Sequence, residues 1–213
     1  MRKTETVAEI RKIFDAVYPD VQCSLNYKTP LQMLIATQLS AQCTDARVNI
    51  VTGPLFERYK TAEDFANADI LELQCYIRSA GFYKNKSKNI IACCRRLVDV
   101  YGGEVPDNME DLLTLAGTGR KTANLVLGDI FNKPAVVVDT HCIRLTNRIG
   151  LVKEQDPVKI EFALKKIVPE DYQNRFCHQL VMHGRAVCPA RSPKCSTCPI
   201  QAFCKKTGVK GGK

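Results

Sequence analysis

The sequence lacks both the long apolar run of a membrane protein and the leader pattern of a secreted one. No stretch of its 213 residues approaches the roughly 18 apolar residues that a membrane-spanning helix needs. The opening segment MRKTETVAEI is charged and has no apolar core of the kind that a signal peptide requires. These two absences predict a cytoplasmic protein.

Acidic residues are also comparatively few, since 22 Asp and Glu stand against 31 Lys and Arg and give a formal net charge of +9. An excess of basic side chains favours a polyanionic partner, above all nucleic acid. A basic but unspecialised surface would give the same sum, so charge alone leaves both interpretations open. The chain is long enough for one large domain or two small ones.

A nucleotide-binding loop is absent as well, although LAGTGRKTANLVL (115–127) resembles one at first sight. Such a loop needs glycines one and six positions before its lysine. Neither of those positions before Lys121 holds glycine. The stretch is therefore interpreted as a tight glycine turn, residues 117–119, between two helix-like runs.

The spacing of apolar residues is helical almost throughout. TPLQMLIATQLSA (29–41) begins with a Thr-Pro pair typical of a helix start and is apolar on all sides, which predicts a central core helix. Only PAVVVD (134–139) resembles a strand, and it is too short and isolated to form a sheet. The predicted fold class is all-α. Predicted helices span residues 5–17, 29–41, 86–101, 108–115, 121–131, 140–149, 157–168 and 172–186.

Cysteine is abundant, with 11 residues in a chain expected to stay reduced. Seven are scattered, mostly beside apolar residues, and are interpreted as small core residues. The other four crowd into CPARSPKCSTCPIQAFC with the spacing C-x6-C-x2-C-x5-C. They are Cys188, Cys195, Cys198 and Cys204. Clustered cysteines in a reducing compartment indicate a metal centre.

The spacing of these four cysteines favours a [4Fe–4S] cluster over zinc. A structural zinc site more often pairs two C-x2-C units, whereas one such unit with wider gaps suits the corners of a cubane. Zinc is the alternative, and four free thiols so close together would invite oxidation. Arg191 and Lys194 lie between the first two cysteines, where they either contact nucleic-acid phosphates or simply face solvent.

The glycine turn followed by Lys-Thr-Ala, the segment VDTH (138–141) and the four-cysteine pattern together resemble the endonuclease III family of helix-hairpin-helix DNA glycosylase/AP lyases. The resemblance covers essentially the full chain, including the LLSAQ-like QLSAQCTD (38–45), GFYKNKSKNI (81–90), GEVPD (103–107) and CHQLVMHGR (177–185). It implies two helical domains that flank a DNA groove. Residues 23–133 would form a six-helix domain with the helix-hairpin-helix, and residues 1–22 plus 134–213 an iron–sulfur cluster domain.

The resemblance assigns the chemistry to Lys121 and Asp139. Lys121 would attack C1′ of an oxidised or damaged pyrimidine nucleotide, form a Schiff base and cut the strand 3′ to the abasic site by β-elimination. The helix dipole and neighbouring Arg120 both disfavour a charged amine there. Asp139 would stabilise the oxocarbenium-like sugar and assist proton transfer. Local sequence alone favours a phosphate-binding lysine of a non-catalytic hairpin for Lys121, and Asp139 can serve as a helix N-cap as well.

The resemblance also implies the DNA contacts. Gln42 would fill the gap left by a flipped nucleotide, and Phe82, where family members often carry Leu, would act as a wedge on the opposite strand. The hairpin LAGTG replaces the usual Leu-Pro-Gly-Val-Gly, a change expected to loosen the turn and weaken its packing. His141 is interpreted as either a core or a phosphate-side residue. The implied DNA-binding residues are Gln42, Phe82, Gly117, Thr118, Gly119, Arg120, His141, Arg191 and Lys194.

The expected partner is double-stranded DNA with a damaged base or an abasic site. The protein is expected to act as a monomer that associates with the nucleoid and not with a membrane. Two other functions compete with this one. A monofunctional glycosylase of the same fold, such as the adenine-removing branch, would lack the lysine nucleophile. A non-catalytic iron–sulfur DNA-binding protein would require Lys121 and Asp139 to occur together by chance.

Overall fold

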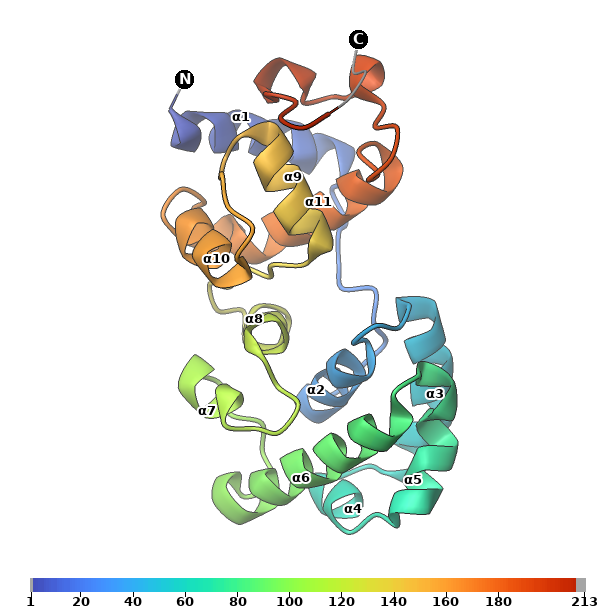
Figure 1. Ribbon diagram of the computed structural model, residues 1–213. Coiled ribbons are helices and arrows are strands. Elements are labelled where there is room, and N and C mark those ends of the chain that lie inside the picture. The colour runs from blue at the N-terminus through green and yellow to red at the C-terminus, as the bar shows by residue number, and fades with distance from the viewer. Residues whose placement is uncertain (1, 210–213) are drawn as a thin grey trace. The chain divides into compact units, whose positions relative to one another are not determined.

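The computed structural model describes residues 2–209, and within that range it contains helices and no β-strand (Figure 1). This confirms the all-α prediction. The chain divides into two compact units: unit 1 comprises Met1–Gln22 and Pro134–Lys213, and unit 2 comprises Cys23–Lys133. None of the helices in the described range is long and apolar enough to cross a membrane.

Unit 2 consists of α-helices of very different length, together with one 3-10 helix, η1. In chain order they are α2 (Pro30–Leu39), α3 (Asp45–Arg58), α4 (Ala62–Ala66), α5 (Ile70–Ile77), η1 (Arg78–Ala80), α6 (Tyr83–Tyr101), α7 (Met109–Leu113) and α8 (Arg120–Asp129).

Helix α2 is the central helix of unit 2, as its apolar sequence predicts. The Thr29 hydroxyl accepts a hydrogen bond from the Gln32 N–H (3.2 Å), and Pro30 occupies the first turn. Eight of its ten residues are buried, and it packs against α3, α6 and α8 (Figure 1). Each large apolar side chain buried in this way contributes on the order of 1.5–3 kcal/mol. The C-terminal end of α2 is therefore held firmly in place.

Helix α6 begins three residues before its predicted start. Its N-cap residue, Phe82, is in the left-handed conformation (φ 48°) and provides no side-chain cap, so no capping signal marks the start. Its end follows the prediction, because Gly102 closes it in the left-handed conformation (φ 60°) that glycine adopts readily.

Unit 1 joins the N-terminal helix to the C-terminal part of the chain. Phe14 of α1 packs in a tilted arrangement against two rings of α11, Phe176 at 6.4 Å and His183 at 5.1 Å between ring centroids. Residues 134–139 belong to no helix and pair with no strand, as expected from their isolation. The elements are α1 (Lys3–Val17), α9 (Thr140–Ile149), α10 (Pro157–Lys165), η2 (Glu170–Tyr172), α11 (Gln173–Ala186), η3 (Cys195–Thr197) and η4 (Gln201–Phe203).

Candidate active site and metal centre

Helices α7 and α8 are joined by a tight turn, residues 114–119. The Thr118 N–H donates to the Leu115 carbonyl (3.1 Å), and Gly117 has a φ of 75°, which favours glycine. A side chain on Gly117 would also place Cβ 3.0 Å from that of Asn89. Gly119 is the N-cap of α8 and has no side chain to bond the first N–H groups of the helix. Those N–H groups and the positive end of the helix dipole suit an anion.

Thr118 is buried in this turn and is paired with a residue of the core helix. Nε2 of Gln38 in α2 donates to the Ala116 carbonyl (3.1 Å) and to the Thr118 hydroxyl (3.3 Å). Gln38 stands where the LLSAQ-like pattern has leucine, so a polar pair replaces an apolar one. The hydrogen bond between Gln38 and Thr118 stabilises the turn at the position where threonine was expected to weaken its packing. That expectation did not consider a polar partner for Thr118.

Lys121 is the second residue of α8, and its side chain is exposed. Cys23, which no sequence pattern marks as a neighbour of Lys121, is only partly buried and lies close enough for the lysine charge to act on its thiol. Burial raises the pKa of the Cys23 thiol to about 12, and the positive charge of Lys121 opposes that shift. The interpretation of all scattered cysteines as core residues is wrong for Cys75, which is exposed.

Asp139 is the N-cap of α9, in unit 1. Its Oδ1 accepts a hydrogen bond from the Cys142 N–H (2.7 Å), which confirms the N-cap interpretation. This bond fixes the side chain and leaves the other carboxylate oxygen to accept a further hydrogen bond.

His141 follows Asp139 by two residues and is only partly buried. Nη2 of Arg144 lies 3.0 Å from His141 Nδ1, and arginine can only donate, so the proton of the neutral ring sits on Nε2. Burial lowers the pKa of His141, and the nearby charge of Asp139 opposes that shift. The arrangement excludes a purely apolar core role and makes Nε2–H a donor.

Gln42 and Phe82 occupy the tips of two loops in unit 2. Both adopt a left-handed backbone, with φ of 53° and 48°, which is uncommon for residues other than glycine. Both side chains are exposed, Phe82 to 63%, so Phe82 is not a core residue. They line one pocket together with Gly117 of the hairpin and the amides of Asn85 and Asn89. The structure therefore brings these three sequence-predicted positions together.

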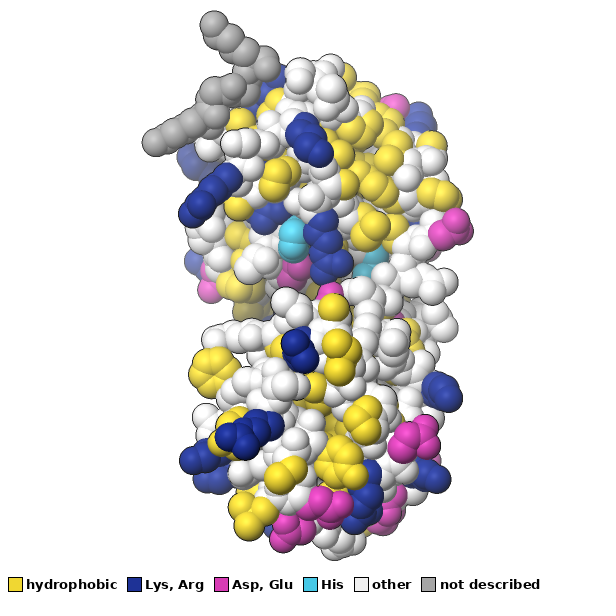
Figure 2. All heavy atoms as spheres, turned by 90° about the vertical axis from the view of Figure 1, so that its right-hand side faces the viewer, with side chains coloured by type: hydrophobic (Ala, Val, Ile, Leu, Met, Phe, Trp, Pro, Cys, Tyr) yellow, Lys and Arg dark blue, Asp and Glu magenta, His cyan; other side chains and the backbone are white. Residues whose placement is uncertain are grey.

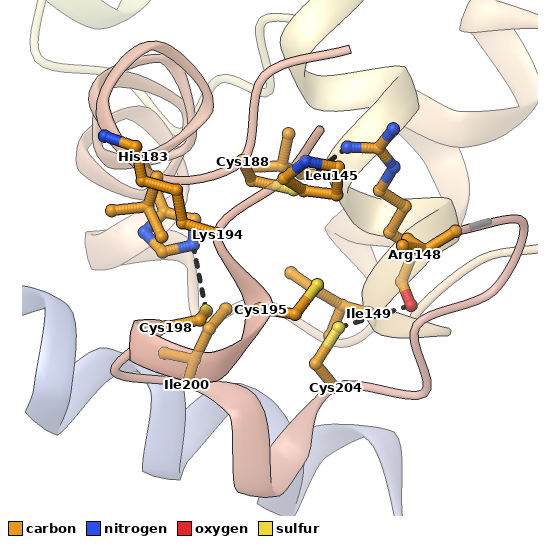
Figure 3. A pocket seen from close by; sticks show the side chains of 13 residues that line it. Leu145, Arg148, Ile149, His183, Cys188, Lys194, Cys195, Cys198, Ile200 and Cys204 are labelled. Atoms are coloured by element: carbon orange, nitrogen blue, oxygen red, sulfur yellow. Dashed lines mark hydrogen bonds between the residues drawn. The ribbon is translucent and has the colours of Figure 1, made fainter. Parts of the chain in front are cut away.

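The four clustered cysteines line one pocket in unit 1 (Figure 3). No three His, Cys, Asp or Glu side chains in residues 2–209 converge closely enough to hold a single metal ion. Burial raises the pKa of the Cys198 and Cys204 thiols, and the other cysteines of the pocket raise it further. A cationic centre bound between these cysteines would favour their thiolate forms.

Hydrogen bonds position these cysteines. Nη1 of Arg148 donates to Cys188 Sγ (3.2 Å), and the Lys206 N–H donates to Cys204 Sγ (3.4 Å). His183 Nε2 lies 3.5 Å from Cys198 Sγ (Figure 3). Such bonds around sulfur ligands orient them and tune the metal that they bind. Local sequence spacing could not reveal Arg148 and His183, which lie outside the cysteine segment.

The loop between Cys188 and Cys195 is held by α9 and α11. Arg148 of α9 also donates to the Pro189 carbonyl (2.7 Å) and the Ala190 carbonyl (2.8 Å). Lys194 is exposed, and its Nζ donates to the Ala186 carbonyl (3.0 Å) at the end of α11. Arg191 is exposed within this loop. The loop therefore presents Arg191 from a fixed backbone, whereas Lys194 is partly engaged.

In each unit taken by itself, Figure 2 shows basic side chains scattered over the visible surface. Acidic side chains gather toward the lower end of that view, the end at which Figure 1 places α4 and α5. The excess positive charge is thus available outside that acidic end to attract a polyanion.

Comparison with known proteins first defines the class. Residues 35–170 match the HhH-GPD superfamily of base excision DNA repair proteins. Relatives include the endonuclease III of Synechocystis sp., 49% identical over 95% of this chain and 93% of its own length, and that of Bacillus subtilis, 41% identical over 89% and 87%. A solved non-covalent endonuclease III–DNA complex and a trapped endonuclease III–DNA covalent intermediate each match with a TM-score of 0.91, 40% identity and 97% coverage of both chains. The chain belongs to the endonuclease III family, which confirms the family predicted from sequence.

The pair formed by Gln38 and Thr118 yields a stability prediction. Gln38→Leu leaves the Thr118 hydroxyl and the Ala116 carbonyl without their buried donor, and we expect it to lower the free energy of unfolding by about 1–3 kcal/mol. Adding Thr118→Val to Gln38→Leu should cost little, whereas Thr118→Val alone should destabilise, with a coupling of about 0.5–3 kcal/mol. Urea denaturation followed by circular dichroism measures all four proteins. Strictly additive effects would contradict the pairing.

Proposed function

We propose that this protein is a base excision repair DNA glycosylase with AP lyase activity that removes oxidised or damaged pyrimidines. The observation that carries the proposal is an exposed lysine directly behind a glycine hairpin, at the start of a helix, in a chain of the endonuclease III family. The related endonuclease III that has been trapped as a covalent DNA intermediate shows that such a protein can bond to its substrate.

Lys121 is the proposed nucleophile. Its Nζ lone pair forms a bond to C1′ while the bond from C1′ to the damaged base breaks, and the base leaves with that electron pair. Loss of a proton from Nζ and opening of the sugar ring give a Schiff base. Removal of a proton from C2′ then expels the 3′ phosphate and cuts the strand.

Asp139 is the proposed catalytic carboxylate. As the base departs, positive charge develops on the sugar, and a nearby carboxylate stabilises it and assists proton transfer. The N-cap bond from the Cys142 N–H holds the side chain of Asp139 and leaves its other oxygen for this task. Structure and catalysis are therefore compatible uses of one residue.

The remaining predicted residues hold the DNA. Gly117, Thr118 and Gly119 form the turn, and the backbone N–H groups that begin α8, with Arg120, grip a phosphate of the damaged strand. Gln42 and Phe82 enter the duplex when the damaged nucleotide turns out of the stack. His141, through Nε2–H, and the loop residues Arg191 and Lys194 contact further phosphates.

A [4Fe–4S] cluster held by Cys188, Cys195, Cys198 and Cys204 completes the proposal. It supplies a cationic centre that neutralises four thiolates and fastens the C-terminal segment of unit 1. The support is that all four cysteines line one pocket, that Arg148 and the Lys206 N–H donate to the sulfurs of Cys188 and Cys204, and that His183 Nε2 lies 3.5 Å from Cys198 Sγ. The reaction at C1′ uses none of the cluster's chemistry.

The nucleophile is tested with a duplex that contains an abasic site and with borohydride, which reduces a Schiff base to a stable amine. We expect the protein to form a covalent adduct on a denaturing gel and Lys121→Ala to form none, because no other amine starts α8. Lys153→Ala, which removes an exposed lysine of unit 1, serves as control. Base release without any adduct would instead identify a monofunctional glycosylase, and neither activity a non-catalytic DNA-binding protein.

The carboxylate is tested with Asp139→Asn. Asparagine is an equally good N-cap, so helix α9 and the stability of the protein should be retained. The loss of charge should slow base release by about a hundredfold or more. Single-turnover kinetics on a lesion-containing duplex measure the rate, and thermal melting checks the fold. An unchanged rate would leave Asp139 with its capping role only.

The metal centre is tested by elemental analysis. Protein purified without oxygen should be brown and contain about four iron and four sulfide per chain. Cys198→Ser should lose iron and destabilise unit 1, whereas Cys75→Ser, which alters an exposed cysteine of unit 2, should do neither. One zinc per chain, with no iron, would contradict the assignment.

A further inference from the structure

Lys86 is a buried lysine that the proposed chemistry does not use. It lies in the first turn of α6, and only 7% of it is exposed, whereas Lys84 and Lys88 on the same helix face solvent. Burial lowers its pKa, as expected when an ammonium loses water. Lysine is rarely buried unless its charge is compensated, so its partners matter.

The partners are two backbone carbonyls at the ends of different helices. Nζ of Lys86 donates to the carbonyl of Leu39, the last residue of α2 (2.8 Å), and to that of Ala80, the last residue of η1 (2.9 Å). Carbonyls at a helix C-terminus lack intrahelical partners and carry its negative dipole end. One ammonium thus connects two helix ends that are 41 residues apart in the chain, at positions 39 and 80.

Each of these helix ends leads directly into one of the two strained loop tips. Gln42 follows Leu39 by three residues, and Phe82 follows Ala80 by two. A left-handed backbone is unfavourable for either residue and persists only where the surroundings hold it. Lys86 lines the same pocket as both side chains.

We propose that Lys86 is a positioning residue that clamps the two loops together and holds Gln42 and Phe82 ready to enter the DNA duplex. The inference rests on the proposed function, because it assumes that these two side chains enter the duplex at the damaged site. Lys86 acts through the backbone of the loops and not on the reacting sugar. Without the clamp, the ordering of both loops would have to occur during DNA binding and would oppose it.

The clamp should matter only where a duplex must be opened. An abasic site in single-stranded DNA presents C1′ to Lys121 without any base stack to enter. The same site in a duplex requires both loop tips to insert. Loss of Lys86 should therefore slow the reaction on the duplex and not on the single strand. A general loss of stability or of Lys121 reactivity would slow the reaction on both substrates equally.

The experiment compares borohydride trapping rates on the two substrates. Lys86→Met should slow trapping on the duplex between about tenfold and a hundredfold and leave the single-strand rate within about twofold of the unmodified protein. Lys86→Arg, which keeps the charge and the donors, should recover most of the duplex rate. Lys88→Met removes the same charge from an exposed position of α6 and should match the unmodified protein on both substrates.

A second readout reports the insertion itself. With 2-aminopurine placed opposite the abasic site, entry of the loop tips unstacks the probe and raises its fluorescence, and Lys86→Met should reduce that rise. Melting by circular dichroism checks the fold, and Lys86→Gln replaces the methionine variant if that one does not fold. Equal duplex rates for Lys86→Met and Lys88→Met, or an equal loss on both substrates, would overturn the clamp. Absence of trapping by the unmodified protein would instead overturn the proposed function.

Discussion

The burial of α2 on nearly every side is the constraint on which unit 2 depends. Because this helix is fixed by its packing, the polar groups at its C-terminal end have fixed positions too. The side chain of Gln38 donates hydrogen bonds that hold the hairpin turn at Ala116 and Thr118. The carbonyl of the next residue, Leu39, accepts a hydrogen bond from Lys86. A single helix end thereby sets the geometry of the hairpin and of both loop tips.

Helix α9 has the corresponding task in unit 1. Its N-terminus is capped by Asp139, and Arg144 and Arg148, one turn apart, both reach the segment that begins at Cys188. A metal cluster in the cysteine pocket would therefore brace the same helix that carries the proposed catalytic carboxylate. Such a centre would thereby support the proposed reaction at C1′ without taking part in it.

Features that depend on neighbouring residues, such as capped helices and closely spaced cysteines, could mostly be predicted from the sequence. Helices with a cap and clear periodicity, such as α2 and α9, were predicted within a few residues, and the four cysteines could be grouped because their spacing is short. Helices α3, α4 and α5 were not predicted, because Pro54 lies inside the first and the other two are short. The catalytic assignments of Lys121 and Asp139 came from the family resemblance and not from local pattern.

Contacts between distant segments could not be predicted. Lys84, Lys86 and Lys88 alternate in one run, and nothing in the sequence indicates that only Lys86 is buried. Likewise, Gln38 and Thr118 are 80 residues apart in the chain. Each is a polar residue where the family pattern has an apolar one, which looks unfavourable until the hydrogen bond between them is known. Polar residues in apolar surroundings were informative only once their partners were known.

The central claim is that Lys121 bonds to the sugar of the damaged nucleotide. Peptide mapping by mass spectrometry of the borohydride-reduced adduct tests it most directly, because it identifies the amine that carries the deoxyribose. If Lys121 is the nucleophile, the deoxyribose is found on Lys121, at the start of α8. A modification on the N-terminal amine or on any other lysine would contradict it.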